Sequence, residues 1–294
     1  MALPVVMFGI GATKAGTSWL HRYLSDHPDC AMSPLKELHY FDRAEVNALP
    51  GEVRRLKAKR AKLAEELAGA EARKRDGLLA GIAAIDRFLP VLRLGREDRA
   101  AYLAFLTGGA GGRRLVGDIT PSYALTAPET LARMQGIAPE VRFVYLLRDP
   151  VDRLWSHLRM LAQRAGAAGA ALQARAEAIF DAWARGDHPE VDARGDYAGA
   201  LAKFARALRP DTLFTQFYET LFSDAAMTRL CRFLGIAPQP GRYGRRVHGG
   251  PEAALSTGRL AVARSRLAPQ YAEVAARLGP LPRRWLENCS EATR

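Results

Sequence analysis

The chain has 294 residues, 48% of them apolar, and a formal net charge of +12 at pH 7. This length and apolar content allow a buried core in one large domain or two small ones, and the charge favours anionic partners such as nucleotides, nucleic acid, acidic glycans or a membrane surface. No segment reaches the ~18 consecutive apolar residues of a membrane-spanning helix, so we expect no membrane span. The three cysteines, Cys30, Cys231 and Cys289, are few, odd in number and without metal-ligand spacing. We therefore expect reduced thiols in the cytoplasm and no set of disulfides.

The run Pro4–Ser18, PVVMFGIGATKAGTS, predicts an apolar strand over Val5–Ile10, a loop bracketed by glycines, and the first turn of a helix. Because this strand begins so close to Met1, we expect no signal peptide. Strand, loop and helix together form a βα unit.

The loop has the frame of a phosphate-binding loop. Gly11 and Gly16 have the spacing of the Walker A motif, but Lys14 lies in mid-loop and Thr17 takes the place of the usual lysine. We expect Lys14 to lie over whatever group is bonded to the bound phosphate. An ordinary strand-to-helix turn is the alternative. The backbone N–H groups expected to face the anion belong to Ala15, Gly16, Thr17 and Ser18.

The stretch Met32–Asp42, MSPLKELHYFD, follows a helix predicted over Ser18–Asp26. It gathers two cations and two carboxylates among apolar residues, and such a cluster beside a phosphate loop is a candidate acid–base site. Glu37 and His39 are its candidate bases. The alternative is a solvated loop held by its apolar side chains.

Residues Arg43–Leu106 are richer in charge and predict a helical hairpin. Apolar residues from Val53 to Ala70 recur at helical spacing, and a second amphipathic segment follows Gly77 and is expected to end at Pro90. The basic residues on the first segment favour a solvated helix face, with a surface for an acidic partner as the alternative.

Two further apolar segments predict strands, Arg114–Ile119 and Val141–Leu147. The second, VRFVYLL, is almost continuously apolar, which is typical of a parallel strand covered by helices on both faces. It ends in Arg148-Asp149-Pro150, where we expect Asp149 to cap a helix and Arg148 to face an anion. Together these elements predict a three-layer α/β fold with a parallel sheet, similar to that of P-loop proteins.

The remaining chain predicts helices over Tyr197–Leu208 and Ala226–Leu234 and a buried strand over Thr212–Tyr218. Gly166–Ala176 is rich in alanine and glycine and predicts either a poorly packed helix or a mobile segment. Arg242–Gly250 is a basic, glycine-rich loop that could wrap an anion, with a solvated loop as the alternative.

These residues resemble those of PAPS-dependent sulfotransferases (PAPS is 3′-phosphoadenosine 5′-phosphosulfate), in the style of the bacterial members and the heparan-sulfate branch. GATKAGTSWL at Gly11–Leu20 is similar to the family's 5′-phosphosulfate loop, and RDPVDRLWS at Arg148–Ser156 is similar to its 3′-phosphate motif. Weaker matches are ELHYFD at Glu37–Asp42, the Thr-Pro-x-Tyr at Thr120–Tyr123, and the stretch Gly195–Leu221. Some members have a lysine before the Thr-Pro pair, where this chain has Ile119.

The resemblance implies in-line transfer of a sulfuryl group from PAPS to an acceptor hydroxyl or amine, with release of PAP and no metal. Lys14 would stabilise the leaving phosphate, and Arg148 and Ser156 would hold the 3′-phosphate. Glu37 would be the base, with His39 second. Arg245 and Arg246 in the basic loop would add contacts to the donor.

We therefore expect one sulfotransferase domain over residues 1–294 with a helical insertion at 43–106. The acceptor could be an acidic glycan, a lipid or a small molecule rather than nucleic acid. The competing interpretations are a P-loop nucleotide kinase, which would need magnesium and ATP, and a non-catalytic anion-binding module, which would turn over no donor. Neither explains two donor motifs at once.

Overall fold

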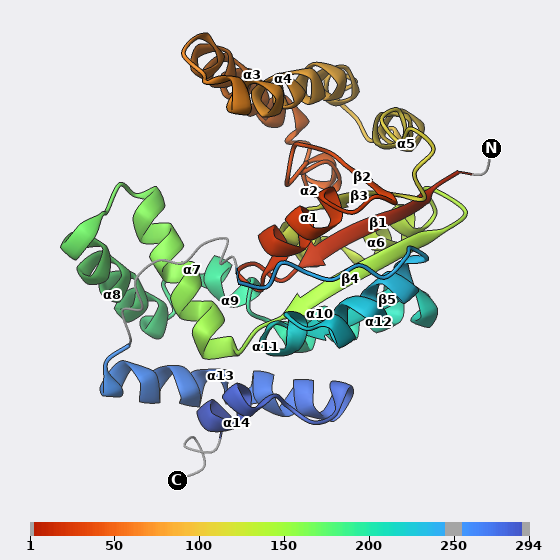
Figure 1. The fold of residues 1–294 in the computed structure, drawn as a ribbon. Helices are drawn as coiled ribbons and strands as arrows, with labels where there is room; N and C mark the ends of the chain where they lie inside the picture. Colours follow the sequence, from red (N-terminus) through yellow and green to blue (C-terminus); the bar gives the residue numbers. More distant parts are fainter. Residues whose placement is uncertain (1–2, 245–254, 290–294) are drawn as a thin grey trace.

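The structure is a computed structural model and describes residues 3–244 and 255–289. Its centre is a five-stranded sheet with the order β2-β3-β1-β4-β5, in which all neighbouring strands are parallel (Figure 1). The strands are β1 Val5–Gly11, β2 Cys30–Met32, β3 Leu115–Ile119, β4 Val141–Leu147 and β5 Leu213–Phe217. The predicted α/β fold is confirmed, and the short β2 is a strand that the sequence pattern did not indicate.

The helical elements connect these strands and cover the sheet. They are α1 Thr17–Ser25, α2 Phe41–Glu45, α3 Leu49–Ala68, α4 Ala72–Arg93, α5 Arg99–Thr107, η1 Pro121–Leu125, α6 Pro128–Gln135, α7 Pro150–Arg164, α8 Gly169–Arg185, α9 Pro189–Ala193, α10 Tyr197–Ala207, η2 Pro210–Thr212, α11 Tyr218–Leu221, α12 Asp224–Leu234, α13 Thr257–Leu278 and α14 Arg283–Cys289.

Helices cover both faces of the sheet. The ring of Tyr145 on β4 packs edge-on against Phe204 of α10, at 5.0 Å between centroids, whereas Arg142 donates a hydrogen bond to the carbonyl of Phe233 on α12. Successive side chains of a strand point to opposite faces, and Arg142 and Tyr145 are three positions apart, so α10 and α12 lie on opposite faces of the sheet. Helix α1 joins the α12 side, where Tyr23 meets Cys231 at 3.1 Å. The result is the expected three-layer arrangement.

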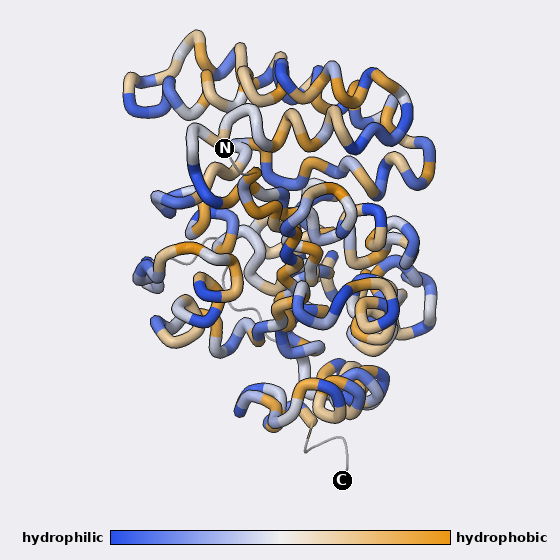
Figure 2. Tube along the Cα trace, turned by 90° about the vertical axis from the view of Figure 1, so that its right-hand side faces the viewer, coloured by the Kyte–Doolittle hydropathy of each residue, from blue (hydrophilic) through white to orange (hydrophobic). Residues whose placement is uncertain are grey.

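The central strands form the hydrophobic core. In β4 only Arg142 is not fully buried, which confirms that this strand is covered on both faces. Figure 2 shows hydrophobic residues concentrated along the centre of the molecule. The prediction of a buried strand over Thr212–Tyr218 was wrong in its burial, because β5 lies at the edge of the sheet and only Gln216 within it is buried.

The segment between α2 and β3 forms the predicted helical hairpin, α3 and α4, which stands at the top of Figure 1. An ion pair of 2.6 Å between Arg60 and Asp86 joins its two helices. The expected end at Pro90 was wrong, because α4 continues to Arg93. Burial of Val91 and Leu92 stabilises this last turn, although proline removes one helical hydrogen bond.

In Figure 1 the C-terminal helices α13 and α14 lie below α7. The sequence analysis did not predict them. The Tyr271 hydroxyl and the Asn288 amide, from α13 and α14, each donate a 2.8 Å hydrogen bond to the Asp149 carboxylate. That carboxylate also caps α7 through the Asp152 N–H, as predicted. Burial raises the pKa of Asp149 to about 6.

Gly166–Ala176 is partly helical, since α8 begins at Gly169. No helix in residues 3–244 and 255–289 has the length and apolar content needed to cross a membrane.

Candidate active site

The loop between β1 and α1 is shaped by two left-handed backbone positions. Lys14 has φ 71° and Gly16 has φ 97°, and a Cβ added at Gly16 would lie 2.9 Å from the Tyr218 ring. Glycine is therefore required there for steric as well as conformational reasons. The first N–H groups of α1 lack partners from a preceding turn, so this end of the helix suits an anion. The expectation that the Ala15 N–H faces the anion was wrong, because this N–H donates to the carbonyl of Ala12 at 3.1 Å. The side chains of Ala15 and Thr17 are buried, and Ser18 is half-buried.

Arg148 follows β4, the neighbour of β1, and so reaches the same loop. Its Nη1 donates to the carbonyl oxygen of Lys14 at 3.3 Å, and its guanidinium lies over the Tyr218 ring, 5.0 Å from the centroid. The backbone of Arg148 is fixed by Tyr197, whose hydroxyl donates to its carbonyl at 2.7 Å. Burial, and then the charge of Arg148, lower the pKa of Lys14. Ser156 lies half-buried in the second turn of α7.

Behind these cations, α7 carries two buried polar side chains one turn apart, Arg153 and His157. Arg153 is 1% exposed and His157 2% exposed. Among the described residues, Nε and Nη1 of Arg153 and Nδ1 of His157 have no hydrogen-bond partner. Burial, followed by the charges of Arg153, Arg194 and Lys14, lowers the pKa of His157 to about 3, so that His157 is neutral. A buried, unpaired cation is costly, which makes this region suited to an anion.

The candidate bases lie on a turn after β2. Glu37 has φ 61° and His39 has φ 53°, both left-handed. The Glu37 carboxylate is 2.6 Å from the Lys36 ammonium and 3.7 Å from His39 Nε2, while His39 Nδ1 is 2.8 Å from Asp42. The Ser122 hydroxyl donates to the same Asp42 carboxylate at 2.7 Å.

These contacts determine which of the two candidates is ionised. Burial alone would raise the pKa of Glu37, but the hydrogen bond from His39 and the charge of Lys36 lower it to about 2. Burial would lower the pKa of His39, but Asp42 and Glu37 raise it to about 9. At neutral pH Glu37 is a carboxylate and His39 an imidazolium. Only Glu37 can then accept a proton, which supports ranking it first.

A buried carboxylate that sequence reasoning missed holds this turn in place. Asp118, at 2% exposure near the end of β3, accepts hydrogen bonds from Tyr123 at 2.6 Å, Tyr102 at 2.7 Å and Thr120 at 2.8 Å. The Tyr123 hydroxyl in turn accepts the N–H of Tyr40 at 3.1 Å. Because Tyr102 belongs to α5, this cluster joins the hairpin segment to the turn that carries Glu37.

Arg194, another residue missed from the sequence, reaches the phosphate loop from the end of α9. Its Nη1 donates to the Thr13 hydroxyl at 3.3 Å. It lines a cavity of about 330 Å³ together with the loop residues Ala12 and Thr13 and with residues of η1 and α10. Lys203, on the α10 side, donates to the carbonyls of Ala124 and Thr126 at 2.5 and 2.8 Å. Arg194 directly precedes the weak family match at Gly195–Leu221 and lies outside it, so the sequence comparison did not single it out.

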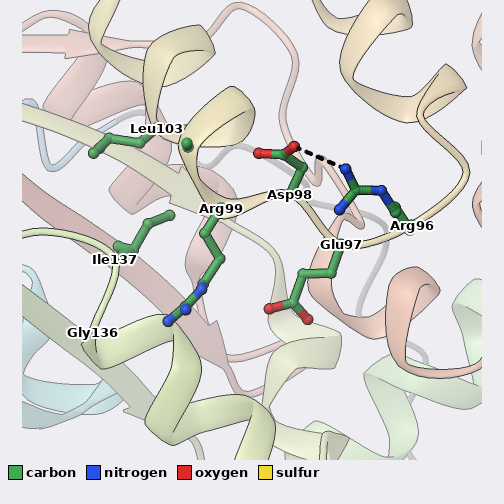
Figure 3. A pocket seen from close by; sticks show the side chains of 8 residues that line it. Arg96, Glu97, Asp98, Arg99, Leu103, Gly136 and Ile137 are labelled. Atoms are coloured by element: carbon green, nitrogen blue, oxygen red, sulfur yellow. Dashed lines mark ion pairs between the residues drawn. The ribbon is translucent and has the colours of Figure 1, made fainter.

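The larger cavity, of about 500 Å³, lies elsewhere, between the start of α5 and the end of α6 (Figure 3). Its acidic groups are paired, Asp98 with Arg96 at 3.8 Å and Glu97 with Arg133 at 3.0 Å. No residue of the phosphate loop, of 32–42 or of α7 lines it. We therefore place the candidate site at the phosphate loop and not in this cavity.

Two sequence predictions concern groups beyond these. Arg245 and Arg246 lie outside the described residues. Ile119, at the position before the Thr-Pro pair, is 1% exposed and packs against Gly9, so it offers no contact to a ligand. In the described ranges, no cluster of three or more histidine, cysteine, aspartate or glutamate side chains could hold a metal ion.

Comparisons with known proteins concern the family and the fold of the chain. A profile of the sulfotransferase family matches residues 4–240. Among solved structures, the chain is similar to a sulfotransferase from Alicyclobacillus acidocaldarius, with TM-score 0.62 and 21% identity over 97% of this chain and 99% of that one. It is also similar to the sulfotransferase domain of the curacin biosynthetic pathway, with TM-score 0.46 and 20% identity over 100% and 99%. A third likeness is the sulfotransferase domain of the Synechococcus PCC 7002 olefin synthase, with TM-score 0.45 and 16% identity over 90% and 94%.

No curated protein matches the chain at a significant level. The Alicyclobacillus structure supports the α/β fold with its parallel sheet. The family profile extends over most of the chain and includes the phosphate loop, the turn with Glu37 and the segment from Arg148 to Ser156. The chain therefore belongs to the sulfotransferase family.

Proposed function

We propose that this sulfotransferase uses PAPS as its donor and transfers the sulfuryl group to a hydroxyl or amine, releasing PAP. One observation carries the proposal: two cations from distant segments meet at one loop. Arg148 Nη1 donates to the Lys14 carbonyl at 3.3 Å, and the charge of Arg148 lowers the pKa of the Lys14 ammonium. A donor with phosphates at both its 3′ and 5′ positions suits this pair better than a single phosphate would.

The residues present fit such a donor. Two guanidinium nitrogens of Arg153 are buried without a partner among the described residues, and the charges of Arg194 and Arg148 act on this group, so a bound polyanion would offset the local positive charge. Tyr218, over which Arg148 lies, and Phe222, whose ring centroid is 4.9 Å from that of Tyr218, add aromatic groups beside the loop.

PAPS supplies an activated sulfuryl group, and the chain's residues bind it, hold charge and move one proton. The N–H groups of residues 16–18 and the Lys14 ammonium would hold the 5′-phosphate, where charge develops as the bridging S–O bond breaks; single donors of this kind often contribute ~3–4 kcal/mol. Arg148 and Ser156 would hold the 3′-phosphate. The cation of Arg148 would give selectivity for this group.

Glu37 would take the proton of the acceptor. As the acceptor oxygen or nitrogen bonds to sulfur, the electron pair of the broken S–O bond stays on the 5′-phosphate of PAP, and the acceptor proton passes to Glu37. A carboxylate with a pKa of about 2 is a weak base until the acceptor loosens its contact with Lys36. His39, held as a cation by Asp42, would orient Glu37 rather than replace it.

The rest of the chain would serve the same reaction. We propose that residues 1–294 form one domain, with 43–106 inserted in it, and the bond from Tyr102 to Asp118 supports this. The acceptor would approach from the cavity beside Thr13, whose lining is largely apolar. Cys30 and Cys231 are buried free thiols, which supports a reducing, cytoplasmic location.

Calorimetry with PAP, ADP and ATP tests the donor. We expect PAP to bind much more tightly than ADP or ATP, in the presence of EDTA. Arg148→Ala should weaken PAP binding by about 2–5 kcal/mol, as for other truncated charge pairs, while Lys14→Ala should lower turnover of labelled PAPS more than PAP affinity. Arg142→Ala, at the other end of β4, is the matched control and should leave PAP affinity unchanged. Equal affinity for all three nucleotides, or a need for magnesium, would overturn the assignment in favour of a kinase.

A further inference from the structure

Arg194 lies where three parts of the site meet. It follows α9, yet its Nη1 bonds the hydroxyl of Thr13, the loop residue directly before Lys14. The charges of Glu37 and Asp42 act on it from the turn that carries the bases, and its own charge acts on His157 of α7. Its guanidinium therefore lies at the phosphate loop, where the carboxylates of the turn that carries the base also act on it.

The charge of Arg194 is available to a ligand. Among the described residues its hydrogen-bond partner is the neutral hydroxyl of Thr13, and no carboxylate forms an ion pair with it. The nearby carboxylates already have partners, Glu37 with Lys36 at 2.6 Å and Asp42 with His39 at 2.8 Å. Burial and the charge of Arg164 lower the pKa of Arg194, but an arginine remains a cation at neutral pH.

The space between loop and base is the space that the transferred group must cross. If the loop holds the 5′-phosphate and Glu37 faces the acceptor, the sulfuryl oxygens lie between them. Three oxygens that share negative charge match the planar, multidentate fork of a guanidinium better than a single ammonium. The Thr13 hydroxyl would orient this fork.

We propose that Arg194 is a catalytic residue that binds the sulfuryl oxygens of PAPS during transfer. This inference rests on the proposed function. Arg194 neither gains nor loses a proton in the step: the bridging S–O bond breaks toward PAP, the new bond forms from the acceptor to sulfur, and the acceptor proton goes to Glu37. Arg194 holds the group that moves, whereas Arg148 holds the group that stays.

Comparing PAPS with PAP tests this assignment without any acceptor, because PAP lacks only the sulfuryl group. In calorimetry, Arg194→Gln should lower PAPS affinity about tenfold or more, equivalent to about 1.4 kcal/mol, and PAP affinity less than about twofold. Arg194→Lys should recover part of the loss, since it keeps the charge without the fork. Thr13→Val should also lower PAPS affinity more than PAP affinity, by a smaller factor than Arg194→Gln does. Unchanged PAP affinity and melting temperature also show that the variant is folded.

Arg164→Gln is the matched control. Its charge acts on Lys14 and Arg194, but it is exposed, and we expect PAPS and PAP affinities to change by the same small factor. Equal losses for both nucleotides in Arg194→Gln, no loss for either, or an Arg164→Gln variant as selective as Arg194→Gln would each overturn the inference. If the unaltered protein binds neither nucleotide, the proposed function itself fails, and the two failures are distinguishable.

Discussion

The stability of the turn that carries Glu37 should depend on pH through His39, and the substitution His39→Gln isolates this effect. Asp42 and Glu37 hold His39 as a cation, so its pKa rises from 6.5 in the unfolded chain to about 9 in the folded protein. The folded state binds the proton more tightly. Its contribution to stability is therefore fully present below pH 6.5 and is lost as the pH rises through 9.

The expected size follows from the same two pKa values. Each pKa unit corresponds to about 1.4 kcal/mol, so protonated His39 contributes at most about 3 kcal/mol to the free energy of unfolding. The side chain is only 19% exposed, so solvent screens this contribution little. Glu37, whose pKa is lowered, loses its contribution only as the pH falls toward 2 and stays constant in the assay range.

Urea unfolding at pH 6, 8 and 10, followed by circular dichroism, gives the free energy of unfolding for both proteins. We expect His39→Gln to be less stable by about 2–3 kcal/mol at pH 6 and by less than about 1 kcal/mol at pH 10. His188→Gln is the control: this histidine pairs with exposed Glu190, so its loss should cost under about 1 kcal/mol. A deficit for His39→Gln that does not change with pH would show that folded His39 is neutral, and His39 could then be the base.

Two further substitutions test the site. Glu37→Gln keeps the shape of the side chain but cannot take a proton, so turnover of labelled PAPS should fall by about 10²–10⁴ while PAP affinity in calorimetry stays within about twofold; near-normal turnover would assign the base elsewhere. Gly16→Ala puts a Cβ 2.9 Å from the Tyr218 ring at φ 97°, which should lower stability by about 1–3 kcal/mol in thermal melting and weaken PAP binding. Gly77→Ala, in α4 with nothing within 4 Å, should be neutral or stabilising, and a Gly16→Ala protein that behaves like it would contradict this account of the loop.

Local patterns in the sequence were sufficient to predict the central strands, the loop after β1 and the start of α7. The apolar run of β4 and the glycine spacing after β1 each depend on neighbouring residues, so their structures could be read without knowing the rest of the chain. The capping of α7 by Asp149 is equally local, because donor and acceptor lie three residues apart. Where burial depends on position in the sheet, as in β5, the local pattern was misleading.

The composition of the site depends on contacts between distant segments. Thr13 and Arg194 are separated by 181 residues, and no periodicity or motif connects them. The ionisation of Glu37 and His39 likewise follows from burial and from charges that the folded turn brings within a few ångströms. A sequence states which groups can ionise or bind. Only the tertiary structure decides their distances and their exposure to water, and electrostatic interactions depend on both.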